Sequence, residues 1–219
     1  MIYVDLDNYD SELNNPAIIL KDYRDIMEGD PSDILPFSDL WRYKRVYFHG
    51  GTWIDADMYL LKRLPDDDII ISSERCCLSG AYKRDIEYIP NIGVLRFPKY
   101  NPLLKECILK IQNRRTKNIK CNSNMFVFQK LLLNKYTHYN ISKPIDYCPI
   151  NWSNIKDLYY SSQFTSKYKK RCDQIDEILA NSTGIHLWEN LSINKYKVDF
   201  EKVNKNSLFF YLNNNVEYN

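Results

Sequence analysis

The fold of this chain can be read from residues 36–64, PFSDLWRYKRVYFHGGTWIDADMYLLKRL. Ser38 is a residue type that favours a helix N-cap, and Asp39 would then lie in the first turn, where the helix dipole favours negative charge. The predicted helix continues through Tyr47 and ends at Gly50–Gly51, because glycine is the usual residue at a helix C-terminus. This helix and its glycine break are the first half of the pattern.

A short apolar run follows the two glycines and ends on two aspartates. Thr52–Ile54 is predicted to form a buried strand, and Asp55 and Asp57 follow it directly. Carboxylates at positions i and i+2 after a strand can converge on one hard cation. Mg²⁺ and Mn²⁺ prefer such oxygens and commonly keep positions for phosphate and water. The pattern therefore predicts a divalent-cation site, although two aspartates at this spacing are common, and Asp5–Asp7 is another pair.

The predicted helix also carries an acid and a base three residues apart. Asp39 and Arg42 share one helix face at this spacing. An anionic acceptor of hydroxyl groups beside the forked guanidinium suits a sugar ring or a phosphate. The alternative is an ordinary surface ion pair, which contributes little to stability.

The ordered set of helix, Gly-Gly, strand and two-aspartate turn resembles the core of DXD-motif glycosyltransferases with the GT-A fold. Ser38-Asp39-x-x-Arg42-Tyr43 and then Gly-Gly-Thr-Trp-Ile-Asp-Ala-Asp are similar to the superfamily of Och1-like mannosyltransferases, capsular-polysaccharide transferases and clostridial glucosylating toxins. The residues of the motif are most similar to those of small bacterial and large-DNA-virus members, such as those of chlorella viruses. The resemblance implies an α/β fold: a single GT-A (nucleotide-diphospho-sugar transferase, Rossmann-like) domain with a central mixed sheet flanked by helices.

The resemblance also implies roles for the residues of the motif. Asp55 and Asp57 would hold Mn²⁺ or Mg²⁺ against the diphosphate of the sugar donor. Asp39 and Arg42 would grip hydroxyls of the donor sugar, and Ser38 would contact phosphate or sugar. Asp39, Arg42, Asp55 and Asp57 are therefore the expected catalytic residues.

Four further positions are candidates outside residues 36–64. Family members often end the catalytic domain with His-x-Trp, so His186 is expected as a metal or diphosphate ligand and Trp188 near the nucleotide or sugar. Asn91 would lie beside the donor sugar and Asp5 near the nucleotide base. The alternatives are a hydrogen-bonded core histidine at 186, an asparagine that caps a turn at 91 and a turn-forming acid at 5.

The rest of the chain predicts alternating strands and helices. His186 and Trp188 should point the same way on a strand over 184–188, because side chains alternate along a strand. Turn and strand are expected over 89–97, and residues 66–68, all aspartates, should form a solvated turn. The other predicted elements are strands at 2–4, 17–20 and 69–72, helices at 102–111, 122–133 and 166–180, and an irregular loop at 146–152.

Length and composition fit one globular domain over residues 1–219, with a mass of 26.2 kDa. The segment 195–219 is either a closing helix or the start of a linker. A net charge of +2 gives no electrostatic reason to expect a nucleic-acid partner.

The six cysteines are scattered, and no CxxC pair suggests structural zinc, so free thiols are expected. The acidic N-terminus does not resemble a signal peptide, and no apolar run has the length of a membrane span. We therefore expect a location in the cytoplasm, or in the host cytoplasm if the protein is viral.

The favoured function is transfer of a sugar from a nucleotide-diphosphate donor, with UDP-glucose first, to a glycan or a protein-linked glycan. One alternative is a metal-dependent phosphohydrolase, but the further clustered acids and histidines of a two-metal site are missing from the sequence. Another is a non-catalytic module that binds a sugar nucleotide or a glycan. The four charges at Asp39, Arg42, Asp55 and Asp57 argue against that module, since simple binding would not need all of them.

Overall fold

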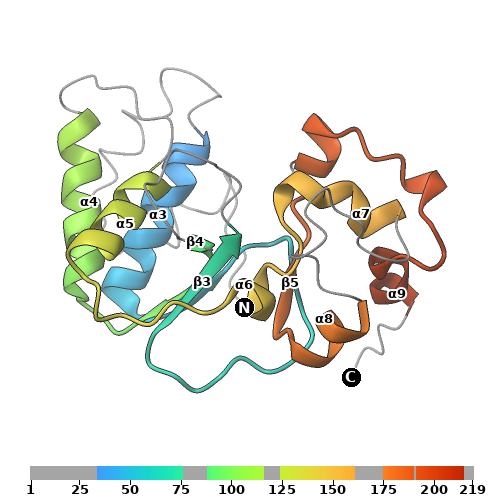
Figure 1. The fold of residues 1–219 in the computed structure, drawn as a ribbon. Coiled ribbons are helices and arrows are strands. Elements are labelled where there is room, and N and C mark those ends of the chain that lie inside the picture. The colour runs from blue at the N-terminus through green and yellow to red at the C-terminus, as the bar shows by residue number, and fades with distance from the viewer. Residues whose placement is uncertain (1–33, 76–87, 116–123, 161–174, 190, 215–219) are drawn as a thin grey trace. The chain divides into compact units, whose positions relative to one another are not determined.

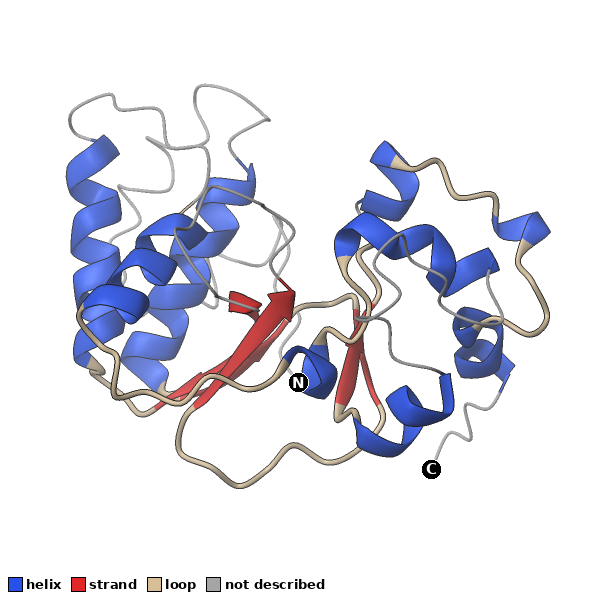
Figure 2. Ribbon diagram, viewed as in Figure 1, coloured by secondary structure: helices blue, strands red, loops and turns tan. Residues whose placement is uncertain are grey.

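A computed structural model describes residues 34–75, 88–115, 124–160, 175–189 and 191–214. The predicted strands at 2–4 and 17–20, together with Asp5 and Asp7, lie outside these residues. The described chain contains both helices and strands, which is consistent with the expected α/β fold (Figure 2).

The elements follow one another in this order (Figure 1): α3 (Ile34–His49), β1 (Gly51–Ile54), β2 (Met58–Leu60), β3 (Ile70–Arg75), β4 (Tyr88–Phe97), α4 (Pro102–Arg115), α5 (Met125–Asn134), α6 (Pro144–Tyr147), η2 (Trp152–Asn154), α7 (Ile155–Tyr160), α8 (Ile175–Asn181), β5 (Gly184–His186), η3 (Leu191–Lys195), η4 (Phe200–Lys202) and α9 (Leu208–Asn214). Among these described helices, none is long and apolar enough to cross a membrane.

The chain divides into two compact units. The first comprises residues 1–52 and 96–139, and the second comprises residues 53–95 and 140–219. The expectation of one domain over residues 1–219 stays a prediction.

The first unit is built on three helices. α4 packs against both α3 and α5 (Figure 1). The helix predicted at 102–111 is confirmed as α4. Its five apolar residues at helical spacing predict one buried face, and all five are buried: Leu103, Leu104, Cys107, Ile108 and Ile111. Tyr43 of α3 is fully buried and stacks on Phe128 of α5, with 5.7 Å between ring centroids. Apolar contact between the helices therefore fixes α3 in this unit.

The two ends of α3 give different outcomes. The helix begins at Ile34, so the predicted N-cap at Ser38 is wrong. Pro36 lies in the first turn, where a missing N–H costs nothing because those N–H groups have no partner within the helix. The predicted end is confirmed: Gly50 has a φ of +68°, and its N–H donates to the Val46 carbonyl oxygen at 2.8 Å.

The strands form two small sheets. One has the order β1-β4-β3, and the other pairs β2 with β5 in antiparallel orientation. Residues 88–97 form one continuous strand, β4, so the turn expected at its start is wrong. The fixed φ of Pro90 is compatible with extended backbone. β1 is half-buried rather than buried as predicted.

Other predicted boundaries shift by a few residues. β3 runs from residue 70 to 75, and α5 starts at residue 125. Part of the loop expected at 146–152 is the short helix α6. α8 covers residues 175–180 of the helix predicted at 166–180 and ends at residue 181. The first part of that prediction, 166–174, lies outside the described residues.

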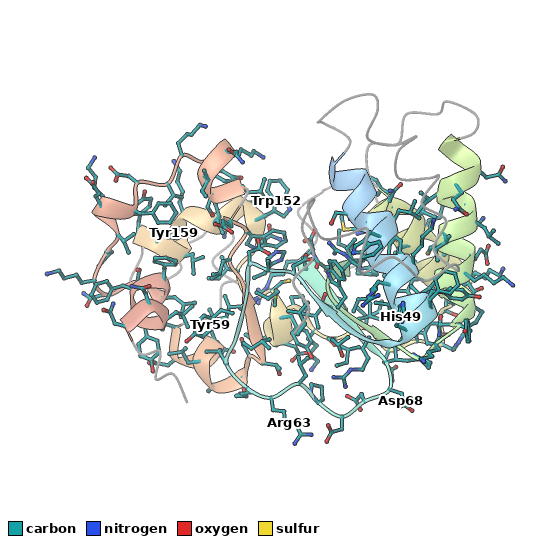
Figure 3. All side chains as sticks on the ribbon, turned by 180° about the vertical axis from the view of Figure 1, so that it is seen from behind. His49, Tyr59, Arg63, Asp68, Trp152 and Tyr159 are labelled. Atoms are coloured by element: carbon teal, nitrogen blue, oxygen red, sulfur yellow. The ribbon has the colours of Figure 1, made fainter. Side chains whose placement is uncertain are left out.

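The second unit has an apolar core of its own. Tyr59 and Tyr159, both labelled in Figure 3, belong to it. Its buried members are Ile150, Ile155, Leu158, Tyr159, Ile178, Ile185, Val198, Leu208 and Leu212. The apolar stretch at 208–212 lies in α9, which packs on α7.

A long loop joins β2 to β3 and carries Arg63 and Asp68 (Figure 3). The three aspartates at 66–68 are exposed, as predicted, and lie in this loop. A smaller buried cluster in the second unit contains Ile70, Val94, Tyr147 and Cys148, with Met58 and Trp188 packed against it.

Candidate metal centre

Asp55, Asp57 and His186 come together in the second unit. Each offers one ligand atom, and these atoms lie within 4.8 Å of one another. The two carboxylates are half-buried and the imidazole is buried. The grouping predicted for the metal site is therefore present in the geometry, although 129 residues separate Asp57 from His186.

The antiparallel pair β2–β5 creates this proximity. Met58 lies opposite His186 in the register of the pair. The pairing continues past the strand end, since the N–H of Leu187 donates to the backbone oxygen of Asp57 at 2.9 Å. Asp57 immediately precedes β2, so the register places its side chain beside the imidazole.

Asp55 is held from two sides. Its Oδ1 accepts a hydrogen bond from the indole Nε1–H of Trp53 at 2.8 Å. Its own backbone N–H donates to the Gly93 carbonyl oxygen at 2.8 Å, which ties the aspartate turn to β4. The second carboxylate oxygen, Oδ2, faces Gly93 and His186.

Asp57 has a different set of partners. Its Oδ1 lies 3.1 Å from His186 Nε2, and its Oδ2 accepts the backbone N–H of Glu189 at 3.0 Å. Burial acts to raise the pKa of Asp57, but the hydrogen bond and charge of His186 and the Glu189 N–H outweigh it, so the pKa is lowered. The side chain is thus held as a carboxylate, the form that binds a cation.

His186 is enclosed by Trp188. The two rings stack with 3.9 Å between centroids and an interplanar angle of 22°. The indole Nε1–H of Trp188 donates to the Ile150 carbonyl oxygen at 2.9 Å. The two rings lie together as expected, but they are not on one strand. β5 ends at His186, and Trp188 has a left-handed φ of +53°. Such strain in a non-glycine residue is often found at functional sites.

The absence of a side chain at Gly93 leaves room between the ligands. A Cβ atom at position 93 would lie 3.4 Å from Asp55 Oδ2 and 3.5 Å from His186 Cε1. The same atom would come within 2.9 Å of Asn91 Oδ1, closer than real Cβ contacts. The space around Gly93 and the donor set of two carboxylates and one imidazole fit a divalent cation.

Asn91 lies against the same space and is held by a buried network. Its Oδ1 accepts the Gly93 N–H at 2.6 Å, and its Nδ2 donates to Glu74 Oε2 at 2.9 Å. Ser72 donates to the Asn91 backbone oxygen at 3.2 Å. The alternative of a capped turn at Asn91 is excluded, because the residue lies inside β4.

Glu74 is a buried carboxyl group in this network. Burial raises its pKa, while the Asn91 amide and the charge of His186 act in the other direction. Sequence reasoning missed Glu74, which carries no motif. It also missed Trp53 and Gly93, although a lone glycine in a strand is a known signal of close approach by other groups.

The other predicted residues lie on α3 in the first unit or outside the described residues. Arg42 is buried, at 6% exposure, so its guanidinium does not lie on the exposed surface. Ser38 and Asp39 are half-buried on the same helix. Their relation to Asp55 and Asp57 stays a prediction, and so does any role of Asp5.

Comparison with known families adds an independent observation. Residues 97–215 match the family described as "Alpha 1,4-glycosyltransferase conserved region", and this range is more than half of the 219-residue chain. The chain belongs to this glycosyltransferase family. Neither a curated protein nor a solved structure matches it.

The protein is therefore a glycosyltransferase, and it uses a sugar donor and an acceptor. The matched range contains His186 and Trp188, whereas Asp55 and Asp57 precede it. The family match and the two-aspartate motif thus come from different parts of the chain, and the geometry joins them at one site.

Proposed function

We propose that this glycosyltransferase is metal-dependent and uses Asp55, Asp57 and His186 as its cation ligands. The observation that carries the proposal is the convergence of their ligand atoms within 4.8 Å. Two carboxylates suit Mg²⁺ or Mn²⁺, and the neutral imidazole favours Mn²⁺ over Mg²⁺.

The donor is a nucleoside-diphosphate sugar, with UDP-glucose as the first choice. The chemistry that the cation supplies when bound is neutralisation of the charge that develops on the diphosphate leaving group. Asp55 and Asp57 place their carboxylates for this purpose, and Trp53 and the Glu189 N–H keep the two side chains oriented. Orientation that is fixed before the reaction lowers the cost of reaching the transition state.

The motif resemblance supports roles in donor binding for residues beyond the aspartate turn. Asp39 and Arg42 bind hydroxyl groups of the sugar, since the buried guanidinium of Arg42 offers forked donors. Ser38 contacts phosphate or sugar, and Asp5 lies near the nucleotide base.

Two groups of the second unit also have proposed roles at the donor. Asn91 contacts the sugar from β4, where its amide is held in a fixed orientation by Gly93 and Glu74. Trp188 covers the nucleotide or the sugar with the indole that stacks on His186.

The product is an α1,4-linked sugar on a glycan or a protein-linked glycan. The support is the description of the matched family. The sugar of UDP-glucose is α-linked to the diphosphate, so an α-linked product means retention of anomeric configuration.

The fold is proposed to be one GT-A domain over residues 1–219, of the kind found in small bacterial and large-DNA-virus glycosyltransferases.

The test is donor turnover by the full chain with Mn²⁺ and with a chelator. We expect Mn²⁺-dependent release of UDP from UDP-glucose, or from another UDP-sugar in a panel, with no inorganic phosphate. Release of phosphate would indicate a phosphohydrolase instead. Turnover that is equal with Mn²⁺ and with chelator would refute metal dependence.

A further inference from the structure

The imidazole of His186 contacts different groups on each side. Its face is covered by Trp188, and Nε2 lies 3.1 Å from Asp57 Oδ1. The other ring nitrogen, Nδ1, lies 3.9 Å from the sulfur of Cys148. Among the described residues, this sulfur is the hydrogen-bond partner of Nδ1. Cys148 is 1% exposed, so water does not compete freely for the contact.

A neutral imidazole carries one N–H, and its position decides which nitrogen can bind a cation. Nε2 faces Asp57, so it is the nitrogen placed to act as a ligand. It can do so only when the proton is on Nδ1. Histidine ligands usually donate this second N–H to a carboxylate, a carbonyl oxygen or water, which fixes the tautomer and the ring orientation. Here the atom at that position is a sulfur.

We propose that Cys148 is a positioning residue of the metal centre: its sulfur accepts the Nδ1–H of His186 and thereby keeps the Nε2 lone pair directed at the cation. This inference rests on the proposed metal dependence. It assigns a role to a cysteine that has no disulfide partner and no ligand position of its own.

The surroundings hold Cys148 in the position that this role requires. Its backbone N–H donates to the Pro144 carbonyl oxygen at 2.8 Å at the end of α6, so the main chain is fixed. The side chain packs with Ile70, Val94 and Tyr147 in the small buried cluster. The sulfur therefore has little freedom to move away from the imidazole.

The protonation state of Cys148 agrees with the role of acceptor. Burial raises the pKa of the thiol well above its ordinary value, and the charges of Glu74, Asp55 and Asp57 raise it further. The sulfur of a neutral thiol is a weak acceptor.

The role has a specific consequence for the two tautomers. Without a cation, a proton on Nε2 lets His186 donate to Asp57 across the 3.1 Å contact. With a cation, the proton must be on Nδ1, where Cys148 accepts it. Removing the acceptor should therefore weaken metal binding more than it weakens the metal-free protein.

The experiment measures Mn²⁺ affinity by calorimetry, without any sugar, on the wild-type protein and on Cys148→Ser, Cys148→Ala and Cys148→Val. We expect about a tenfold loss of affinity in the Ala and Val variants, at the lower end of the 10- to 100-fold range for outer-shell partners. The serine hydroxyl is also an acceptor, so Cys148→Ser should recover most of the affinity. Cys107→Ala is the control, because Cys107 is equally buried but lies on α4.

Each outcome decides the matter. Wild-type affinity in Cys148→Ala or Cys148→Val, or an equal loss in Cys148→Ser, would overturn the positioning role. Cys148→Val fills the space of the thiol without an acceptor, so it replaces the Ala variant if that variant does not fold. If the wild-type protein binds no Mn²⁺, the proposed metal dependence fails and this inference fails with it.

Discussion

Nε2 of His186 and Oδ1 of Asp57 lie 3.1 Å apart, across an antiparallel pair whose strands are far separated in sequence. The contact connects the aspartate turn that precedes β2 to the end of β5. In the metal-free protein it links the two segments, and in the proposed enzyme both groups become ligands. The register of three residue pairs, between 58–60 and 184–186, therefore determines whether these two side chains meet.

Asp57→Asn should abolish Mn²⁺-stimulated turnover and leave the fold intact. The amide oxygen can still accept one of the hydrogen bonds from His186 and Glu189, but the charge that attracts the cation is lost. We expect Mn²⁺ affinity to fall by at least the roughly 10- to 100-fold that outer-shell changes already cause. Calorimetry and a UDP-release assay measure the two effects.

The control for this variant is Asp68→Asn, on the exposed loop between β2 and β3 (Figure 3). It removes the same charge from the protein without touching the centre. If Asp57→Asn kept the affinity and rate of the wild-type protein, the metal assignment would be wrong.

Gly93→Ala should close the space between the ligands. The added Cβ would come within 2.9 Å of Asn91 Oδ1, an atom that the Gly93 N–H already holds. The Asn91 amide must move, or the added methyl group must press on Asp55 and His186. We expect weaker Mn²⁺ binding and a higher donor KM, together with a lower melting temperature, because a shift of the Asn91 amide disturbs its buried hydrogen bonds. Unchanged affinity and unchanged KM together would show that the space is not used.

The sequence predicted the three residues that converge better than it predicted the residues that hold them in place. Asp55 and Asp57 were recognisable because a glycine break, an apolar strand and two acids follow one another in a short stretch. His186 needed the resemblance, since a lone histidine on an apolar strand is more often a core residue. The register that unites it with Asp57 depends on pairing between distant strands, which local periodicity does not encode.

The supporting residues could not be found from local pattern. Glu74 and Cys148 have no motif, and their importance comes from burial against groups of other strands. The start of α3 was misplaced because a serine at 38 looked like a cap, whereas Pro36 is tolerated inside the first turn. By contrast, the apolar face of α4 was predicted correctly, because five apolar residues at helical spacing leave one arrangement that buries them.

Arg42→Lys tests the proposed grip on the sugar. Lysine keeps the charge but cannot reproduce the forked geometry of the guanidinium. We expect kcat/KM for the donor to fall by about 10- to 150-fold, the equivalent of the 1.5–3 kcal/mol of a hydrogen bond to a charged group. Arg45→Lys makes the same exchange three residues further along α3 and should have a small effect. Near-normal kcat/KM in Arg42→Lys would remove the residue from the donor site.

The thiols of Cys107 and Cys148 should be free and slow to react. Both are buried, and burial raises the pKa of each thiol. Iodoacetamide at pH 8 should label neither residue in the folded protein within the time that labels both in guanidinium. Peptide mass analysis gives the extent at each site. Rapid labelling of the folded protein would contradict the burial of these side chains.

Glu74→Gln should stabilise the metal-free protein at neutral pH. Burial is the largest influence on this carboxyl and raises its pKa, so the charged form is disfavoured in the folded state. The cost of ionisation is fully present above the raised pKa. It declines as the pH falls through that value and vanishes below the ordinary glutamate pKa of about 4.3, where both states are protonated. The oxygen of glutamine can still accept the hydrogen bond from Asn91.

The measurement is the melting temperature of both proteins in chelator across this pH range. Glu74→Gln should melt at a higher temperature at pH 7, and the difference should disappear at about pH 3.5. Glu106→Gln is a control of opposite sign, because the hydrogen bond from Lys135 is the main cause of a lowered pKa at Glu106. That variant should be slightly less stable at pH 7, and its deficit should disappear as Glu106 is protonated. A Glu74→Gln protein that is no more stable than wild type at pH 7 would show that the buried carboxylate carries no net cost.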